Sequence, residues 1–312
     1  MLIAILGATS QIARDYISDA ARSGAHEYYL FARNKEAVLN WLRATGCVGN
    51  FKVCEISSFP MSMKWDAVLN FVGVGNPAQA ARMGREILAV TEDFDRLSLD
   101  FVQRNPACRY VFLSSGAAYG GKFVEPASED SVAAFNINAL GAQDWYGLAK
   151  FQAECRHRAM GELPAFDLRV FSYFSASQDL SARFLISDAV RAIDNAECLK
   201  TSPQNIVRDY IGAGDFGRLL DSILSSPPSN DVIDCYSKAP IDKFSLLEAL
   251  KSEYGLSYEI ERTGDVGINA TGVKQNYFSI NRRAALYGFL PEHDSKEVVL
   301  NGVSSILEGG CQ

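Results

Sequence analysis

The chain has 312 residues, of which 48% are hydrophobic, 21% charged and 11% aromatic, and its formal net charge is −7. These proportions are typical of a globular protein and exclude a disordered, collagen-like or disulfide-scaffold chain. The negative balance argues against a general surface for nucleic acid or anionic membranes. It leaves room for a small anionic ligand, because one pocket needs only a few local donors.

The seven cysteines and three histidines predict neither a disulfide framework nor a metal site. The cysteines are odd in number and scattered, without a CxxC pair, and His26, His157 and His293 lie outside any ligand spacing. No apolar segment reaches the roughly 18 residues of a membrane span. The first residues carry no basic region of the kind that opens a signal peptide. We therefore expect reduced thiols, no metal, no membrane partner and a cytoplasmic location.

In the first half of the chain, short apolar runs alternate with segments of helical periodicity. The runs predict strands at residues 2–6, 28–31, 51–54, 67–71, 110–113 and 166–171. Helices are predicted at residues 11–22, 83–102 and 143–160. Runs without polar alternation suit strands buried on both faces, and strand–helix alternation indicates parallel βαβ units. The predicted fold is an α/β doubly wound parallel sheet.

The second half is less regular. Its patterns predict helices at residues 183–193, 215–224, 244–254 and 297–307, strands at 232–236 and 258–261, and a loop at 225–230. We expect residues 1–171 to form a cofactor-binding domain, to which parts of about 204–236 return. Residues 172–312 would mainly form a smaller substrate-binding lobe.

A run of small residues follows the first predicted strand and opens a helix. The run is Gly7-Ala8-Thr9-Ser10-Gln11-Ile12-Ala13. Small residues in this context let the turn and the helix N-terminus approach a pyrophosphate, whose charge the amides and the helix dipole stabilise. Ser10 and Ala13 stand where glycines are usual, so a plain strand-to-helix turn with Ser10 as N-cap is the alternative.

The end of the second strand carries no carboxylate. A dinucleotide fold that uses NAD places an acidic residue there for the ribose 2′-hydroxyl. Here the residues are Arg33 and Asn34, and Arg33 could pair with a 2′-phosphate. This predicts NADP(H) in preference to NAD(H), with an ordinary surface arginine as the alternative.

A tyrosine and a lysine lie four residues apart in a predicted helix, and a serine pair ends a predicted strand. Tyr146 and Lys150 would share one helix face, where the ammonium would lower the pKa of the phenol toward neutral pH. Ser115 would point from the strand end toward the ligand region and could bond a substrate oxygen opposite Tyr146. A turn serine is the alternative for Ser115.

In this order, the four features resemble the extended short-chain dehydrogenase/reductase family, in particular its NAD-dependent epimerase/dehydratase group acting on nucleotide sugars. The resemblance implies a Rossmann-type fold and assigns catalysis to Ser115, Tyr146 and Lys150. It also places Asn70-Phe71-Val72-Gly73 beside the adenosine side of the cofactor. The family's pattern SSxxxYG favours Ser115 over Ser114.

The second half extends the resemblance. Arg208, in Val207-Arg208-Asp209-Tyr210-Ile211, and Arg262, in Arg262-Thr263-Gly264-Asp265, look like the family's two arginines for the substrate diphosphate. Either could instead be a solvated surface arginine. Ser172 stands where many relatives carry a substrate-binding asparagine, and Asn281 where many carry an aspartate. The family's GPG loop is missing.

The resemblance implies an enzyme whose partner is a nucleoside diphosphate sugar. Gly116 and Ala117 replace the Asp-Glu pair of sugar-nucleotide 4,6-dehydratases, which disfavours dehydration. We expect an NADP(H)-dependent 4-ketoreductase, with a 4-epimerase that retains NAD(P) as the alternative and a non-catalytic NADP-binding protein as a third possibility. A homodimer through helices 83–102 and 143–160 is also implied, with simple packing of these helices on the sheet as the alternative.

Overall fold

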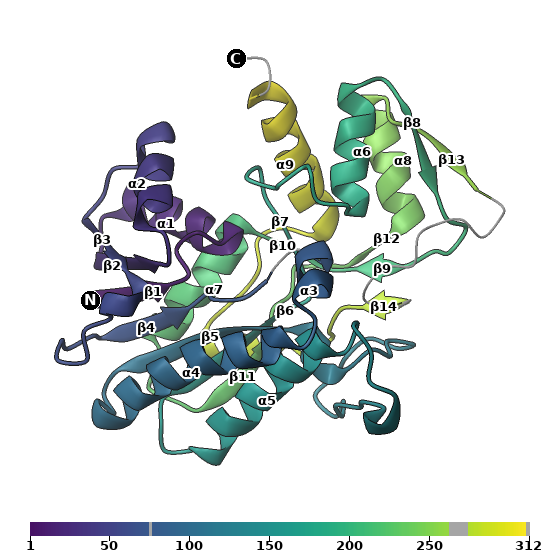
Figure 1. Cartoon of the computed structure of the whole chain (residues 1–312). Coiled ribbons are helices and arrows are strands. Elements are labelled where there is room, and N and C mark those ends of the chain that lie inside the picture. Colours follow the sequence, from purple (N-terminus) through teal and green to yellow (C-terminus); the bar gives the residue numbers. More distant parts are fainter. Residues whose placement is uncertain (75–76, 262–273, 310–312) are drawn as a thin grey trace.

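A seven-stranded parallel sheet forms the centre of the protein, as the computed structural model of the chain shows (Figure 1). The structure describes residues 1–74, 77–261 and 274–309. The strand order is β11-β6-β5-β4-β1-β2-β3, and every neighbouring pair is parallel. The strands are β1 (Leu2–Leu6), β2 (Glu27–Ala32), β3 (Phe51–Glu55), β4 (Ala67–Asn70), β5 (Arg109–Ser115), β6 (Ala165–Val170) and β11 (Asp231–Asp234). The predicted α/β doubly wound fold is confirmed.

Helices cover both faces of the sheet (Figure 1). One face packs against α1 (Gln11–Ser23), α2 (Lys35–Ala44) and α7 (Ala213–Ser225), and the other against α4 (Glu86–Arg104) and α5 (Trp145–Ala159). Each face has its own cluster of buried apolar side chains. Because both faces are covered, β1 and β4 consist almost entirely of apolar residues.

The helix predicted at residues 83–102 corresponds to α4, which begins at Glu86. A short helix that the sequence analysis did not predict, α3 (Pro77–Met83), precedes it and ends before Gly84, whose φ is 52°. Glycine adopts this left-handed conformation without strain and commonly terminates a helix. The predicted start at residue 83 therefore falls at the boundary between the two helices.

A smaller lobe lies beyond the sheet and contains α6 (Leu185–Asp194), α8 (Lys243–Tyr254) and α9 (Ser295–Gly309) (Figure 1). Its separate core joins side chains such as Val190, Leu247 and Val299. Short strands complete it: β7 (Ser172–Phe174), β8 (Cys198–Thr201), β9 (Val207–Arg208), β10 (Tyr210–Gly212), β12 (Ile241–Asp242), β13 (Ser257–Ile260) and β14 (Asn276–Tyr277).

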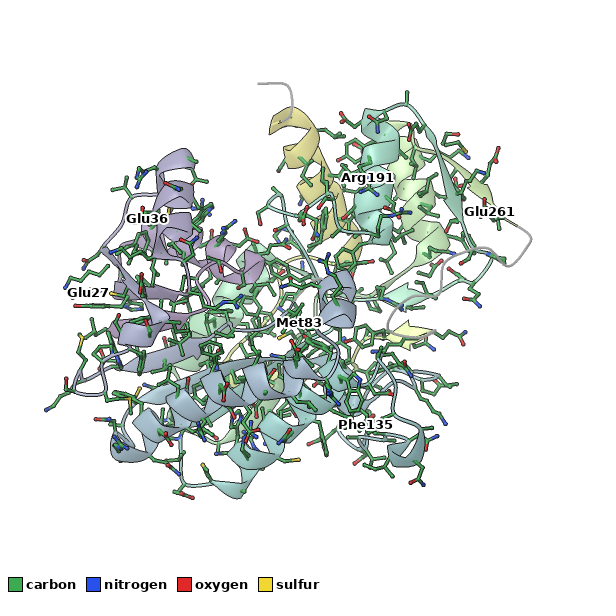
Figure 2. The ribbon with its side chains drawn as sticks, viewed as in Figure 1. Glu27, Glu36, Met83, Phe135, Arg191 and Glu261 are labelled. Carbon is green, nitrogen blue, oxygen red and sulfur yellow. The ribbon has the colours of Figure 1, made fainter. Side chains whose placement is uncertain are left out.

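Figure 2 labels Arg191 and Glu261 in this lobe, and Glu27 and Glu36 at the opposite end of the molecule beside β2 and α2. β11 belongs to the central sheet, although it follows much of the lobe in the chain. The division of the chain at residue 171 stays a prediction. None of the helices in the described part of the chain is long and apolar enough to cross a membrane.

A buried histidine ties the two helices of one face to the sheet. The ring of His157, on α5, lies 2.7 Å from a carboxylate oxygen of Asp95 on α4 and 2.6 Å from one of Asp167 on β6. Burial lowers the pKa of His157, but the two carboxylates outweigh it and raise the pKa from 6.5 to about 9. The imidazolium therefore donates to both carboxylates at neutral pH.

We expect this network to make stability depend on pH. A histidine whose pKa is raised on folding stabilises the fold fully below about 6.5, and this contribution is lost as the pH rises through about 9. Raising a pKa from 6.5 to about 9 corresponds to a contribution of about 3 kcal/mol to the free energy of unfolding. His157→Gln should lower the free energy of unfolding by about this much near pH 6.

Urea unfolding from pH 6 to pH 9 measures the difference between wild type and variant, and His26→Gln provides the control. The difference should shrink as the pH rises. A difference that stays constant across this range would contradict a charged His157.

Candidate active site

The carboxyl ends of β1, β4 and β5 meet at one edge of the sheet, where the strand order changes direction. We call this edge, with the loops that leave it, the carboxyl edge. Gly7 ends β1 there with a φ of 77°, and a Cβ at Gly7 would lie 2.8 Å from the amide nitrogen of Val72. Both the conformation and the close approach require glycine at this position.

The turn after Gly7 leads directly into α1. Ser10 caps the helix by accepting a hydrogen bond from the amide of Ala13 at 3.3 Å, and no acidic residue occupies the first turn. The N-cap role of Ser10, which was the alternative interpretation of residues 7–13, is therefore present. It coexists with an exposed Thr9 and with a helix N-terminus whose dipole favours an anion.

The side chains of Gln11 and Ile12, which follow the turn, make different contacts. The side-chain amide of Gln11 donates to the hydroxyl of Ser175 at 3.1 Å and to the side-chain oxygen of Gln178 at 3.3 Å. Ile12 packs against the core of the α1 face. The turn is thereby joined to the segment that follows β7.

Arg33 and Asn34 follow β2 at the same edge, and both are exposed. Asn34 caps α2 by accepting from the amide of Ala37 at 3.1 Å. Among the described residues, no carboxylate forms an ion pair with Arg33. Its guanidinium therefore remains available to a ligand beside the first turn.

The segment after β4 passes Lys150. The side chain of Asn70 is fixed by Tyr110 and accepts from the amide of Val72, while Phe71 is buried. A Cβ on Gly73 would lie 3.4 Å from the ammonium nitrogen of Lys150. The predicted cofactor segment Phe71-Val72-Gly73 and the predicted catalytic lysine are therefore neighbours.

The structure brings Ser115, Tyr146 and Lys150 together. Ser115 is the last residue of β5, and the other two lie one turn apart near the start of α5. The ammonium of Lys150 donates to the carbonyl oxygen of Leu113 at 2.7 Å and lies 5.9 Å from the ring centroid of Tyr146.

Burial dominates the pKa values of the pair. It raises the pKa of Tyr146, and the hydroxyl of Ser115 partly offsets this effect. Burial lowers the pKa of Lys150 to about 8, although Asp95 and Glu154 raise it. The expectation that Lys150 would bring down the pKa of the phenol is not realised in this arrangement, because the ammonium bonds a backbone carbonyl. Tyr146 therefore retains its proton at neutral pH.

Two glycines allow α5 to approach the loop after β5. A Cβ on Gly147 would lie 2.5 Å from the carbonyl oxygen of Ala117, and one on Gly116 would overlap the ring of Phe171. A side chain at position 116 is thus excluded by packing. The acidic pair expected of a dehydratase cannot be placed here without moving Phe171.

A buried ion pair supports the serine pair from behind. Glu154 accepts from the hydroxyl of Ser114 at 2.5 Å and binds Arg169 through both carboxylate oxygens. Arg169 lies over the ring of Tyr119, 4.2 Å from its centroid. Ser114 is thus occupied in a structural contact, whereas Ser115 faces the tyrosines.

The structure describes some, but not all, of the residues predicted to bind the substrate. Ser172 begins β7 and is half-buried. Arg208 forms β9 with Val207, and its guanidinium donates to the carbonyl oxygens of Val207 at 2.7 Å and Lys274 at 2.9 Å. Arg262 lies outside the described residues.

Two residues that the sequence analysis did not identify also reach the site. The hydroxyl of Tyr277 lies 3.2 Å from that of Ser115, and the ammonium of Lys274 lies 4.3 Å from the centroid of the Tyr277 ring. The contact between Tyr277 and Ser115 spans 162 positions in the chain. No local pattern indicates such a contact, and only the tertiary fold creates it.

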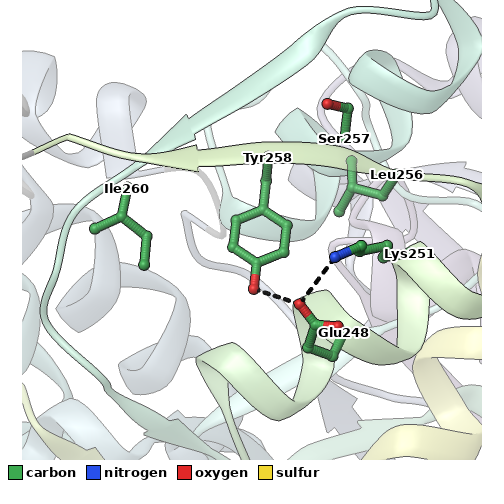
Figure 3. A pocket seen from close by; sticks show the side chains of 6 residues that line it. All are labelled: Glu248, Lys251, Leu256, Ser257, Tyr258 and Ile260. Atoms are coloured by element: carbon green, nitrogen blue, oxygen red, sulfur yellow. Dashed lines mark hydrogen bonds and ion pairs between the residues drawn. The ribbon is translucent and has the colours of Figure 1, made fainter.

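A separate hollow of about 430 Å³ lies between α8 and β13 in the smaller lobe (Figure 3). Its polar groups bond one another, since the hydroxyl of Tyr258 donates to Glu248 at 2.7 Å and Lys251 lies 3.5 Å from the same carboxylate. It contains none of the residues of the carboxyl edge, and we do not assign the active site to it.

In the described residues, no group of three or more histidine, cysteine, aspartate or glutamate side chains is arranged to hold a metal ion. The candidate site is therefore built from hydroxyl, phenol, ammonium and guanidinium groups around Ser115.

Solved structures with the same fold are numerous. UDP-glucose-4-epimerase from Stenotrophomonas maltophila, with bound NAD and formylated UDP-arabinopyranose, superimposes with a TM-score of 0.81 at 17% identity, covering 100% of this chain and 99% of that one. UDP-glucose 4-epimerase from Thermotoga maritima, with UDP-glucose, gives 0.77 at 16% identity and covers 100% of both chains. The dTDP-glucose 4,6-dehydratase from Bacillus anthracis, with NAD, gives 0.77 at 14% identity over 99% and 97%.

A search among curated protein sequences finds no match. The sequence profile described as the NAD dependent epimerase/dehydratase family matches residues 3–235, from β1 to the end of β11. This range includes the turn after Gly7, the serine pair and the Tyr146–Lys150 pair. The chain belongs to the NAD-dependent epimerase/dehydratase family.

Proposed function

We propose that the protein is an NADP(H)-dependent oxidoreductase that reduces a keto group of a nucleotide-linked sugar, in the manner of a 4-ketoreductase. The observation that carries this proposal is the convergence of Ser115, Tyr146 and Lys150 at the carboxyl edge. Such a set can position a carbonyl oxygen and exchange a proton with it.

The residues of the edge fit a dinucleotide. Gly7 permits a close backbone approach, the capped N-terminus of α1 offers a positive dipole end, and Gly73 leaves space beside Lys150. When bound, the nicotinamide would supply hydride to the carbonyl carbon. Arg33 would bind a 2′-phosphate, and the absence of a carboxylate at the end of β2 supports NADP(H) over NAD(H).

The protein's own groups would handle the proton. Tyr146 is protonated at neutral pH, which is the state required of a donor to the carbonyl oxygen during reduction. Ser115 would orient that oxygen by hydrogen bonding. The ammonium of Lys150, which lies beside Gly73, would contact the ribose of the cofactor.

The ligands of similar structures support a nucleotide sugar as the substrate class. Solved structures of the same fold hold UDP-glucose and formylated UDP-arabinopyranose. By resemblance, Arg208 and Arg262 would bind the diphosphate, and Ser172 would contact the sugar side of the substrate. Guanidinium groups suit this role because each can bind two phosphate oxygens.

A 4-epimerase that retains its cofactor is the second candidate, supported by the several 4-epimerases among the similar structures. The two activities differ in the fate of the cofactor, which a reductase consumes and an epimerase regenerates.

Dehydration is not supported, because Phe171 occupies the space that an acidic side chain at position 116 would need. Dimerisation through α4 and α5 stays a prediction.

Tyr146→Phe should reduce turnover about a hundredfold or more, because it removes the proton donor while leaving the aromatic ring in place. Binding of NADPH should change little. Turnover with nucleotide-linked 4-keto sugars measures the effect, and Tyr29→Phe, on the distant β2, is the matched control. If the variant turned over as fast as the wild type, Tyr146 would not be the donor.

Arg33→Asp should exchange the cofactor preference. A carboxylate would repel the 2′-phosphate and bond the 2′-hydroxyl, so we expect affinity for NADPH to fall about tenfold or more while affinity for NADH is kept or improved. Fluorescence titration with both cofactors measures this, with Arg43→Asp on the same surface as control. If the wild type and the variant had equal affinities for each cofactor, Arg33 would not be a cofactor-binding residue.

A further inference from the structure

Two cationic side chains on the substrate side of the site have no carboxylate partner in the part of the chain that the structure describes. Lys274 is only 7% exposed, and Arg208 is half-buried on β9. Among the residues that the structure describes, neither side chain forms an ion pair with a carboxylate. The guanidinium of Arg208 donates to backbone carbonyls, and the ammonium of Lys274 lies over aromatic rings.

The other buried cations of the described residues have carboxylate or carbonyl partners, and Lys150 and Lys243 donate to the carbonyl oxygens of Leu113 and Ser202. Arg169 binds Glu154 through two oxygens, and the imidazolium of His157 lies between two carboxylates. A buried charge without a partner is costly, because it has lost its hydration without gaining an opposite charge. Lys274 therefore differs from the structural cations and has the properties expected of a ligand-binding group.

Tyr277 connects this pair of cations to the reacting centre. Its ring centroid lies 4.3 Å from the ammonium of Lys274 and 5.7 Å from the central carbon of the Arg208 guanidinium. Its hydroxyl lies 3.2 Å from that of Ser115. The side chain of Tyr277 thus links Lys274 and Arg208 to Ser115.

We propose that Lys274 and Arg208 form a single anion site, in which Lys274 binds an anionic oxygen of the nucleotide sugar next to the reacting sugar ring. This inference rests on the proposed function and adds Lys274 to it. The anionic oxygen belongs either to the diphosphate or to a carboxylate on the sugar. Both present the same chemistry to an ammonium group, and the experiment separates them.

The charge of Lys274 gives the site a pH dependence. Burial and the neighbouring Arg208 lower the pKa of Lys274 to about 8, while the carboxylate of Asp144 raises it. The phenol of Tyr277 faces the same ammonium, and its pKa is raised by burial. Affinity for an anion should therefore fall as the pH rises above about 8. Lys274→Arg should remove this fall, because a guanidinium keeps its charge.

Calorimetric titration of the full chain tests the proposal with inorganic pyrophosphate, UDP-glucose and UDP-glucuronic acid as probes. In Lys274→Met we expect binding to weaken about tenfold to a hundredfold, the usual effect of losing a hydrogen bond to a charged group. Lys274→Arg should retain binding. Lys238→Met, at an exposed lysine of the chain, is the control and should bind as the wild type does.

Two patterns support the proposal and distinguish the source of the anion. Equal weakening of all three probes assigns Lys274 to the diphosphate, and weakening of UDP-glucuronic acid alone assigns it to a sugar carboxylate. A folded Lys274→Met protein that binds every probe like the wild type overturns the proposal, as does a wild type that binds none of them. If Lys274→Met does not fold, a Lys274→Arg protein whose affinity for pyrophosphate falls above pH 8 as steeply as that of the wild type overturns it; a smaller remaining fall is expected from Lys150, whose pKa is also about 8. Pyrophosphate binding that depends on Lys274 without turnover of any nucleotide sugar would contradict only the proposed function.

Discussion

The site depends on the register between one face of α5 and the last three residues of β5. Lys150 donates to the carbonyl of Leu113, Glu154 accepts from Ser114, and Tyr146 meets the hydroxyl of Ser115. The three α5 residues are spaced four apart, so they share one face of the helix. Each successive turn of the helix therefore contacts a different residue of the strand end.

This register requires a close approach that only glycine allows. Gly147 brings α5 against the carbonyl of Ala117, where a Cβ would lie 2.5 Å from the oxygen. Deeper in the interface, His157 joins α5 to Asp95 on α4 and to Asp167 on β6. The helix is thus anchored at both ends, and the phenol of Tyr146, next to Gly147 in the chain, is held beside the serine.

The distribution of charge explains how a protein with a net charge of −7 can bind anionic ligands. Its buried carboxylates are largely bonded to structural partners, as Glu154 is to Arg169. Arg33, Arg208 and Lys274, which have no carboxylate partner among the described residues, lie where a cofactor phosphate and a substrate anion are proposed to bind. Net charge describes the whole surface, whereas affinity depends on these few positions.

Much of the fold could be predicted from the sequence, because the strands of the sheet are continuous apolar runs and the intervening helices are strongly periodic. The pair of Tyr146 and Lys150 was also recognisable, since four-residue spacing fixes a common helix face. The short helix α3 and most of the short strands of the smaller lobe were missed, because local periodicity does not report them, whereas β13 was predicted at residues 258–261. Tyr277 and Lys274 could not be found, because their positions beside Ser115 arise from contacts between distant segments.

The most direct test of the account is to follow the hydrogen that it proposes to be transferred. The wild-type protein would be incubated with NADPH deuterated at the nicotinamide and with a panel of nucleotide-linked 4-keto sugars. We predict one deuterium on the former carbonyl carbon of a product for each cofactor molecule consumed. A protein that binds NADPH but transfers no deuterium to any sugar of the panel would contradict the central claim.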